Sequence, residues 1–543
     1  MPTLPRLSRH ALCLAIASLL SACATTTPRE AAAPAPPPAP VFTLEETSVV
    51  ELQRKMGAGE LTAHAIAQQY LDRIAAIDKA GPQLNAVIEL NPEALAIADA
   101  LDAERKAGKV RGPLHGIPVL LKDNIDTADA MQTSAGSLAL VGASATQDST
   151  VAAKLRDAGA VILGKTNLSE WANIRSNRSS SGWSARGGQT KNPYVLDRNP
   201  CGSSAGSGAA VSANLVAIAV GTETDGSIIC PSSLNGLVGI KPTVGLVSRA
   251  GIVPISHSQD TAGPMTRSVA DAAALLGVLA GSDSHDKASW DADKHRADYV
   301  RALDANGLKG ARIGVVRKFA GFNPDVDAAL NTAISALRNA GAIVIDPVDV
   351  PNSDKYGDEE LVVLLYELKA DLNAYLATRR GVPVTSLAEV IAFNKQHAAE
   401  EMHWFGQELF EQAQAKGPLT DKAYKDAAAK SRKLAREGLD AALKKDRLDA
   451  LIAPSNAPSW PTDWINGDHV TGGNTQPAAV AGYPSLTVPM GLVHDLPVGL
   501  SFIGTAWSEE KLIRLGYAFE QATHGRVAPK FQSHFSPEAA PAK

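Results

Sequence analysis

The feature that most limits the fold of this chain is a series of short, unbroken apolar runs that alternate with helical patterns and glycine-rich turns. Such runs are typical of strands buried on both faces, as in an α/β sheet covered by helices. The pattern predicts one large α/β domain over residues 43–530, with a helical insertion at 358–445. The predicted strands lie at 117–121, 160–164, 215–221, 237–240, 312–316, 342–345, 450–454 and 485–489.

Composition and charge exclude one class of partner. The chain has 543 residues, of which 45% are hydrophobic and 20% are charged, and its formal net charge is −5. This is the composition of an ordinary globular protein, and no basic block stands out. Because nucleic-acid binders carry clustered positive charge, we expect no nucleic-acid partner.

The first residues have the pattern of an export signal. Arg6 and Arg9 precede an apolar run at 11–20, which is too short to span a membrane. The segment ends in Leu20-Ser21-Ala22-Cys23, which resembles the bacterial lipobox. We therefore expect a signal peptide at 1–22, a lipidated Cys23, and a periplasmic protein that contacts the membrane only through this lipid. A plain signal-peptidase site is the alternative.

Both ends of the chain are predicted to lie outside the folded domain. Residues 23–42 are rich in proline and alanine and have no apolar periodicity, which indicates an extended, disordered tether after the lipidated cysteine. Residues 531–543 are predicted to form a flexible tail.

Two of the four cysteines, Cys201 and Cys230, lie in the predicted domain. An exported protein can join such a pair in a disulfide. Small buried cysteines are also common in apolar cores. The sequence leaves both interpretations open.

Small residues are concentrated in two segments, CGSSAGSGAA (201–210) and GTETDGS (221–227). Glycine and serine at this density let backbone amides approach a ligand closely and point at one oxyanion. Upstream, Lys122 ends an apolar run, where a lysine is unfavourable unless it is paired or takes part in chemistry. A buried lysine that loses its charge can act as the base for a serine nucleophile.

These segments resemble the amidase signature family. The resemblance extends over about residues 45–525, with the motifs in the family's order. It implies a single domain with a central mixed β-sheet covered by helices on both faces, hydrolysis of linear amides, and no metal or other cofactor. The matching motifs are HGIPVLLKDNID (115–126), GKTNLSEWAN (164–173), CGSSAGSGAA (201–210), GTETDGSIICPSSLNGLVGIKPT (221–243), SQDTAGPMTRSVADAA (258–273) and QPAAVAGYPSLTVPMG (476–491).

The resemblance also implies a Ser-Ser-Lys triad. Ser227 matches the nucleophile that forms the acyl-enzyme, Ser203 matches a bridging serine that follows a cis peptide bond, and Lys122 matches the base. Ser203 would relay the proton between the other two groups. The oxyanion would be held by the backbone amides of Thr224, Asp225, Gly226 and Ser227.

Substrate preference is less transferable than mechanism. Many family members have glycine where this chain has Asp225 and arginine where it has Ile229. The segment at 176–194 and the export signal most resemble bacterial peptide amidases, which remove the C-terminal carboxamide of peptides as ammonia. We therefore expect a small-molecule or short-peptide amide as substrate. The alternatives are a general aliphatic or aryl amidase and a noncatalytic envelope binding lipoprotein with this fold.

Three other motifs fit less well. Ser204 is the centre of a G-x-S-x-G pattern, the nucleophile elbow of α/β-hydrolases, but neither His469 nor His494 lies in a recognisable catalytic loop. The S-x-x-K motif at Ser508 begins a helical pattern and is interpreted as an N-cap with a solvated charged face. The histidines of HAAEEMH (397–403) lack the spacing of H-E-x-x-H, so no zinc site is expected there.

Overall fold

The computed structural model describes residues 42–536. The predicted signal peptide, Cys23 and nearly all of the predicted tether lie outside the described residues, as does the end of the predicted tail. No helix within residues 42–536 combines the length and the apolar character needed to cross a membrane.

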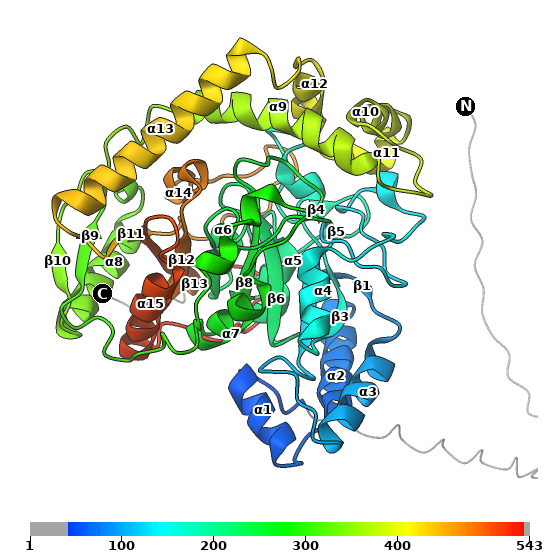
Figure 1. The fold of residues 1–543 in the computed structure, drawn as a ribbon, viewed down its shortest axis with the longest axis horizontal. Coiled ribbons are helices and arrows are strands. Elements are labelled where there is room, and N and C mark those ends of the chain that lie inside the picture. The colour runs from blue at the N-terminus through cyan, green and yellow to red at the C-terminus, as the bar shows by residue number, and fades with distance from the viewer. Residues whose placement is uncertain (1–41, 537–543) are drawn as a thin grey trace, which may run out of the picture. The chain divides into compact units, whose positions relative to one another are not determined.

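A mixed sheet of eleven strands runs through the protein (Figure 1), in the order β1-β3-β2-β6-β8-β7-β12-β13-β11-β9-β10. β2 is parallel to both β3 and β6, whereas β8 is antiparallel to its two neighbours. The strands are β1 (Val87–Leu90), β2 (Pro118–Lys122), β3 (Val161–Thr166), β6 (Ile218–Glu223), β7 (Val238–Lys241), β8 (Thr261–Thr266), β9 (Arg312–Val315), β10 (Ile343–Ile345), β11 (Ala450–Pro454), β12 (Ser485–Val493) and β13 (Leu496–Ile503), and a separate pair is formed by β4 (Trp183–Ser184) and β5 (Gly188–Gln189).

The predicted fold class is confirmed, and each of the eight predicted strands is present within a few residues of its expected position. The sequence did not predict β1, β8 and β13. β8 is a central strand but contains Gly263 and Pro264, two residues that argue against a strand interior. β1 is short and lies at the sheet edge, where few residues are buried.

Helices cover both faces of the sheet. α4, α7, α15 and α8 pack against one another in one layer, and α5 and α6 belong to another. Every residue of α5 and α6 is buried, which explains why neither helix has a polar face. The helices are α1 (Val49–Gly57), α2 (Ala63–Arg73), α3 (Ala94–Lys106), α4 (Thr150–Asp157), α5 (Ala205–Ser212), α6 (Ile229–Leu234), α7 (Val269–Leu279), α8 (Pro324–Asn339), α9 (Gly357–Leu376), α10 (Leu387–Gln396), α11 (Ala398–Glu401), α12 (Glu408–Gln414), α13 (Lys422–Lys445), α14 (Thr475–Ala481) and α15 (Glu509–Thr523).

The segment predicted as a helical insertion contains α9 to α13. The two long helices α9 and α13 lie side by side, outside the sheet (Figure 1). An apolar cluster joins α9, α10 and α12 to residues near the ends of β2 and β3, among them Ala135 and Trp171. The segment is therefore packed onto the side of the domain where these strands end.

Arg175 fastens this helical segment to the rest of the domain. Its guanidinium donates to Glu170 Oε1 at 2.6 Å and to the backbone carbonyl of Glu401. It also lies over the ring of Phe405, with 4.4 Å between the guanidinium carbon and the ring centroid. The side chain is 1% exposed, and its charge opposes the rise that burial causes in the pKa of Glu170.

Replacing Arg175 by alanine is expected to lower the free energy of unfolding by about 3–5 kcal/mol, because it leaves the buried side chains of Glu170 and Glu401 without the charged partner that they share. Urea titration of the folded protein measures this change. The matched control is Lys422→Ala, which breaks a pair with Asp426 whose side chains are 86% and 63% exposed. We expect that control to change stability by less than about 1 kcal/mol. Equal effects of the two substitutions would contradict the assignment.

Candidate active site

The three residues of the predicted triad lie at or just beyond the carboxyl ends of neighbouring strands, or in the loop before α5. β2 and β6 are parallel neighbours, so their carboxyl ends lie together, and Lys122 is the last residue of β2. Ser227 follows the end of β6 and precedes α6, while Ser203 precedes α5. The Gly202–Ser203 peptide bond is cis, as the resemblance implied.

The amine of Lys122 has three polar neighbours. Its Nζ lies 2.7 Å from Ser203 Oγ, 2.9 Å from Thr222 Oγ1 and 3.2 Å from the Thr222 carbonyl oxygen. A neutral amine has two N–H bonds and one lone pair. If both N–H groups donate to Thr222, the lone pair faces the hydroxyl of Ser203, which is the geometry needed to accept its proton.

The electrostatic surroundings of Lys122 favour this neutral form. The side chain is fully buried, and loss of hydration lowers the pKa of Lys122 to about 7. The carboxylates of Asp260 and Glu223 act in the opposite direction and prevent a larger decrease of this pKa. Lys122 is therefore poised to act as a base near neutral pH.

Backbone hydrogen bonds hold the two serines near each other. The amide of Ser204, the residue after Ser203, donates to the carbonyl of Ser227 at 3.2 Å, and the carbonyl of Ser203 accepts from the amide of Ser169 at 3.0 Å. The side chain of Ser203 is almost completely enclosed, whereas Ser227 retains slight exposure. The arrangement fits a relay serine behind a nucleophile that a substrate can reach.

The turn before Ser227 presents free amides. Gly226 has a φ of 79°, and a Cβ there would lie 3.2 Å from Thr475 Oγ1, so glycine suits both the conformation and the space. Within residues 42–536, the backbone amides of the four residues expected to hold the oxyanion, Thr224, Asp225, Gly226 and Ser227, donate to no protein acceptor. They are available to an oxyanion. The next two amides, by contrast, are occupied by the carboxylate of Glu223.

Asp225 stands where many family members have glycine, and its surroundings disfavour the charged form of its carboxyl. Its side chain is partly buried, and its Oδ1 is enclosed with no hydrogen-bond partner among the described residues. Burial and the neighbouring carboxylate of Glu360 raise the pKa of Asp225 well above its usual range. This shift favours the neutral acid over the carboxylate, and the neutral acid does not oppose a developing oxyanion.

The sequence did not reveal several residues that hold these groups in place. Thr222 contacts Lys122 through two atoms, and Thr224 Oγ1 donates to Asp260 at 2.6 Å. Gln259 links the carbonyl of Thr224 to the carboxylate of Glu360 on α9. Thr222 and Asp260 both lie in motifs of the resemblance, but only the pairing of β6 with β2 and β8 identifies their partners.

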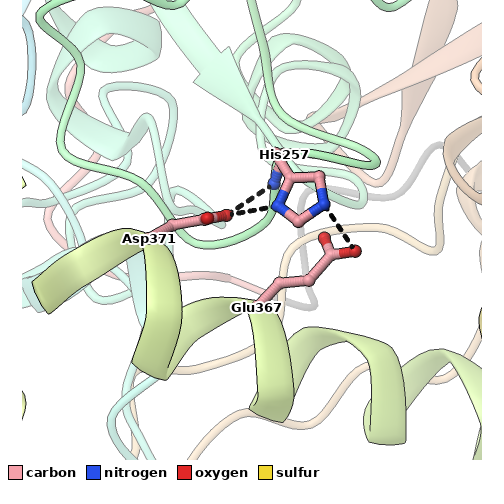
Figure 2. A group of neighbouring side chains, drawn as sticks. All are labelled: His257, Glu367 and Asp371. Atoms are coloured by element: carbon pink, nitrogen blue, oxygen red, sulfur yellow. Dashed lines mark hydrogen bonds and ion pairs between the residues drawn. The ribbon is translucent and has the colours of Figure 1, made fainter. Parts of the chain in front are cut away.

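A cavity lies beside this edge of the sheet. Its wall includes Thr222 and Thr224 from the site, an apolar stretch at 252–255, and Asp371 from α9. His257, also in the wall, lies between two acidic side chains of α9 (Figure 2). Thus the helical segment contributes directly to the cavity.

The two ring nitrogens of His257 face carboxylates. Nδ1 is 2.8 Å from Asp371 Oδ2, and Nε2 is 3.2 Å from Glu367 Oε1 (Figure 2). The bond to Asp371 and the charge of Glu367 raise the pKa of His257. A doubly protonated imidazolium satisfies both contacts, so the three residues form an ionic clamp between the cavity wall and α9. The stabilising effect of this clamp is fully present below the ordinary pKa of histidine. It is lost as the pH rises through the raised pKa of His257.

The structure also bears on the competing motifs. The Ser204 hydroxyl donates to the Thr222 carbonyl at 3.0 Å and accepts from the Thr222 amide, so it is engaged with β6.

The interpretation of Ser508 was wrong in detail: its hydroxyl donates to the Thr505 carbonyl and makes no capping bond. The following Glu509 is 2% exposed and accepts from the Thr243 amide, whereas Glu510 is exposed and Lys511 is partly exposed, so the expected charged face is solvated only in part.

The two cysteines form a disulfide. Cys201 and Cys230 are joined with 6.0 Å between their Cα atoms. The bond resolves the question that the sequence left open. It packs with Leu234 and Trp460 in a small buried cluster.

Removing the charge of Asp260 should move the pH dependence of catalysis in a defined direction. The pKa of Lys122 is about 7, and the Asp260 carboxylate raises it. We therefore expect Asp260→Asn to shift the acid limb of kcat/KM to lower pH than that of the wild type. Asp260→Glu retains the charge and is the matched control. We expect the acid limb of its kcat/KM profile to lie near that of the wild type. A shift of the Asp260→Asn limb to higher pH would be inconsistent with this electrostatic account.

Together, these features define the class of the site. A nucleophilic serine lies near a relay serine and a buried lysine, and the turn that carries it has free backbone amides. This is the arrangement of a serine hydrolase. A family model described as Amidase matches residues 65–513. The chain belongs to the amidase family and is an enzyme that hydrolyses carboxamide C–N bonds.

Known proteins similar to this chain include solved and curated amidases. The crystal structure of native peptide amidase from Stenotrophomonas maltophilia is 55% identical, with a TM-score of 0.86, and the match covers 91% of this chain and 100% of that chain. The crystal structure of an amidase family protein from Bacillus anthracis is 38% identical, with a TM-score of 0.82 and coverage of 89% of this chain and 92% of that chain. A probable amidase from Arabidopsis thaliana is 43% identical over 500 residues, covering 90% of this chain and 92% of the relative.

Proposed function

We propose that this amidase removes the C-terminal carboxamide of short peptides and releases a peptide acid and ammonia. The observation that carries the proposal is the 55% identity to a peptide amidase over the whole of that solved chain. The cavity beside Thr222 and Thr224 supports it, because its apolar stretch at 252–255 can accommodate an uncharged part of a peptide. Small aliphatic or aryl amides are the second candidate class.

In the proposed reaction, neutral Lys122 accepts the proton of Ser203 while Ser203 accepts the proton of Ser227. The Ser227 oxygen attacks the carboxamide carbon, and the free amides of the 225–227 turn hold the oxyanion. The proton returns through Ser203 to the leaving nitrogen as the C–N bond breaks, and ammonia departs. Water, deprotonated through the same relay, then hydrolyses the acyl ester and restores Ser227.

Ammonia release from an N-blocked dipeptide amide tests the substrate class. The protein is the folded domain starting near residue 42, and Ser227→Ala is the control. We expect ammonia from the wild type and none above background from the variant. Turnover of aliphatic or aryl amides combined with no turnover of peptide amides would replace the first substrate class by the second. No turnover of any amide by the folded protein would favour the binding-protein alternative.

We infer that the protein is exported and held at the cell envelope by a lipid on Cys23. The signal pattern at 1–22 supports this inference. The Cys201–Cys230 disulfide supports it independently, because structural disulfides persist mainly in oxidising compartments.

The anchor is tested with the full chain expressed in a bacterial host. We expect the wild type to incorporate a labelled fatty acid and to sediment with membranes, and Cys23→Ser to lose both properties. Identical behaviour of the two proteins would rule out lipidation at Cys23. Recovery of the wild type with its first 22 residues intact in the cytoplasm would rule out export.

A further inference from the structure

The Cys201–Cys230 disulfide lies where the two serine-bearing loops meet. Cys201 is two residues before Ser203, and Cys230 is three residues after Ser227. The covalent bond therefore fastens the loop of the relay serine to the turn of the nucleophile. Neither sulfur belongs to the triad or to the turn with free amides.

Each cysteine is tied to the backbone of its own loop. The amide of Cys230 donates to the carbonyl of Gly226 at 2.8 Å and thereby closes the turn that contains Ser227. The amide of Cys201 donates to Asn199 Oδ1, also at 2.8 Å. A displacement of either sulfur is therefore transmitted to backbone next to a serine of the triad.

Few other bonds connect these two loops. Among the described residues, the direct hydrogen bonds between 199–204 and 226–235 run from the Ser204 amide to the Ser227 carbonyl, at 3.2 Å, and from the Asn235 side chain to the Pro200 carbonyl, at 2.9 Å. Proton transfer between two hydroxyls tolerates little displacement, because a shift of about 1 Å can lower the rate about 100-fold. Two hydrogen bonds alone permit more relative motion than a covalent link does.

We propose that this disulfide is a positioning element for catalysis, which limits the displacement of the Ser203 loop relative to the turn that carries Ser227. The proposal rests on the roles assigned to these serines under the proposed function, but not on the identity of the substrate. Losing the bond should therefore lower kcat with little change in KM, since the cavity wall at 252–255 and the clamp of His257 do not include it.

The test compares the wild type with a Cys201→Ser/Cys230→Ser double variant. Two readouts are used: kcat and KM on an amide substrate, and the rate constant for labelling of Ser227 by a fluorophosphonate, which reports activation of the nucleophile without the natural substrate. We expect kcat and the labelling rate constant to fall about 10- to 100-fold and KM to stay within about twofold.

Two controls separate positioning from stability. Leu439→Ala removes a buried side chain from an apolar cluster that includes no residue of either loop, and it should lower thermal stability without lowering the labelling rate constant. The folded wild type is also reduced with dithiothreitol, which supplies two electrons and two protons to give two thiols and its own cyclic disulfide. Labelling should fall on reduction and recover on reoxidation.

The proposal is overturned if the double variant and the reduced enzyme label at the wild-type rate, or if Leu439→Ala shows the same loss as the double variant. If the double variant does not fold, reduction of the folded wild type decides the question. A wild type that labels rapidly but does not release ammonia from peptide amides would contradict the substrate assignment alone, because the labelling comparison still measures the effect of the disulfide.

Discussion

Replacing Lys122 by methionine is expected to lower kcat for amide hydrolysis by at least about 10⁴-fold, because the relay then has no base. Methionine fills a similar volume without an amine, so the buried site beside Thr222 should remain packed. Steady-state kinetics with a peptide amide measure the loss. The remaining activity should no longer show an acid limb near pH 7, since that limb belongs to the lysine.

Lys165→Met is the matched control for this substitution. Lys165 is also a fully buried lysine and lies on β3, beside β2, but its amine donates to the Ile125 carbonyl and to Thr133 Oγ1. We expect this variant to be less stable, to keep kcat within about tenfold of the wild type, and to retain the acid limb. If Lys122→Met kept near-wild-type turnover, or if the two variants lost activity equally, Lys122 would not be the base.

Replacing Ser203 by alanine is expected to lower kcat by about 10²- to 10⁴-fold, the range that a positioned proton-transfer group contributes. The hydroxyl is the group of Ser203 that hydrogen-bonds to Lys122, and the backbone bonds of the loop to Ser169 and Ser227 remain possible. KM should change little, because no substrate contact is removed. Rapid-quench measurement of the acylation step should locate the loss there.

Ser204→Ala is the matched control for Ser203→Ala. The two serines are adjacent and equally enclosed, but the Ser204 hydroxyl bonds only to the backbone of Thr222. We expect Ser204→Ala to retain at least about a tenth of the wild-type kcat, with some loss of stability from two unpaired backbone groups. A larger loss from Ser204→Ala than from Ser203→Ala would reverse the roles and favour the nucleophile elbow.

Much of the fold was predictable because the strands that form the sheet centre are continuous apolar runs. β2, β3 and β6 were found in this way, and they position the site. β8 was not, because Gly263 and Pro264 are tolerated there only through tertiary packing between β6 and β7. Local propensity contains no information about such neighbours.

The site was predictable to the extent that its residues lie in motifs. Lys122, Ser203 and Ser227 were named from the resemblance, and the structure places the first two 2.7 Å apart. The double contact of Thr222 with the lysine was not predictable, because it depends on the pairing of two strands about 100 residues apart in the chain. The disulfide was undecided for a similar reason, since only the fold brings Cys201 and Cys230 together.

Trapping the acyl-enzyme tests the central claim most directly. The folded enzyme is mixed with the p-nitrophenyl ester of a short peptide, quenched with acid during turnover, digested and analysed by tandem mass spectrometry, with Ser203→Ala and Ser227→Ala in parallel. We predict the acyl group on Ser227 in the wild type, slower acylation of the same residue in Ser203→Ala, and none in Ser227→Ala. An acyl group on Ser204 or Ser203 in the wild type would contradict this account of the site.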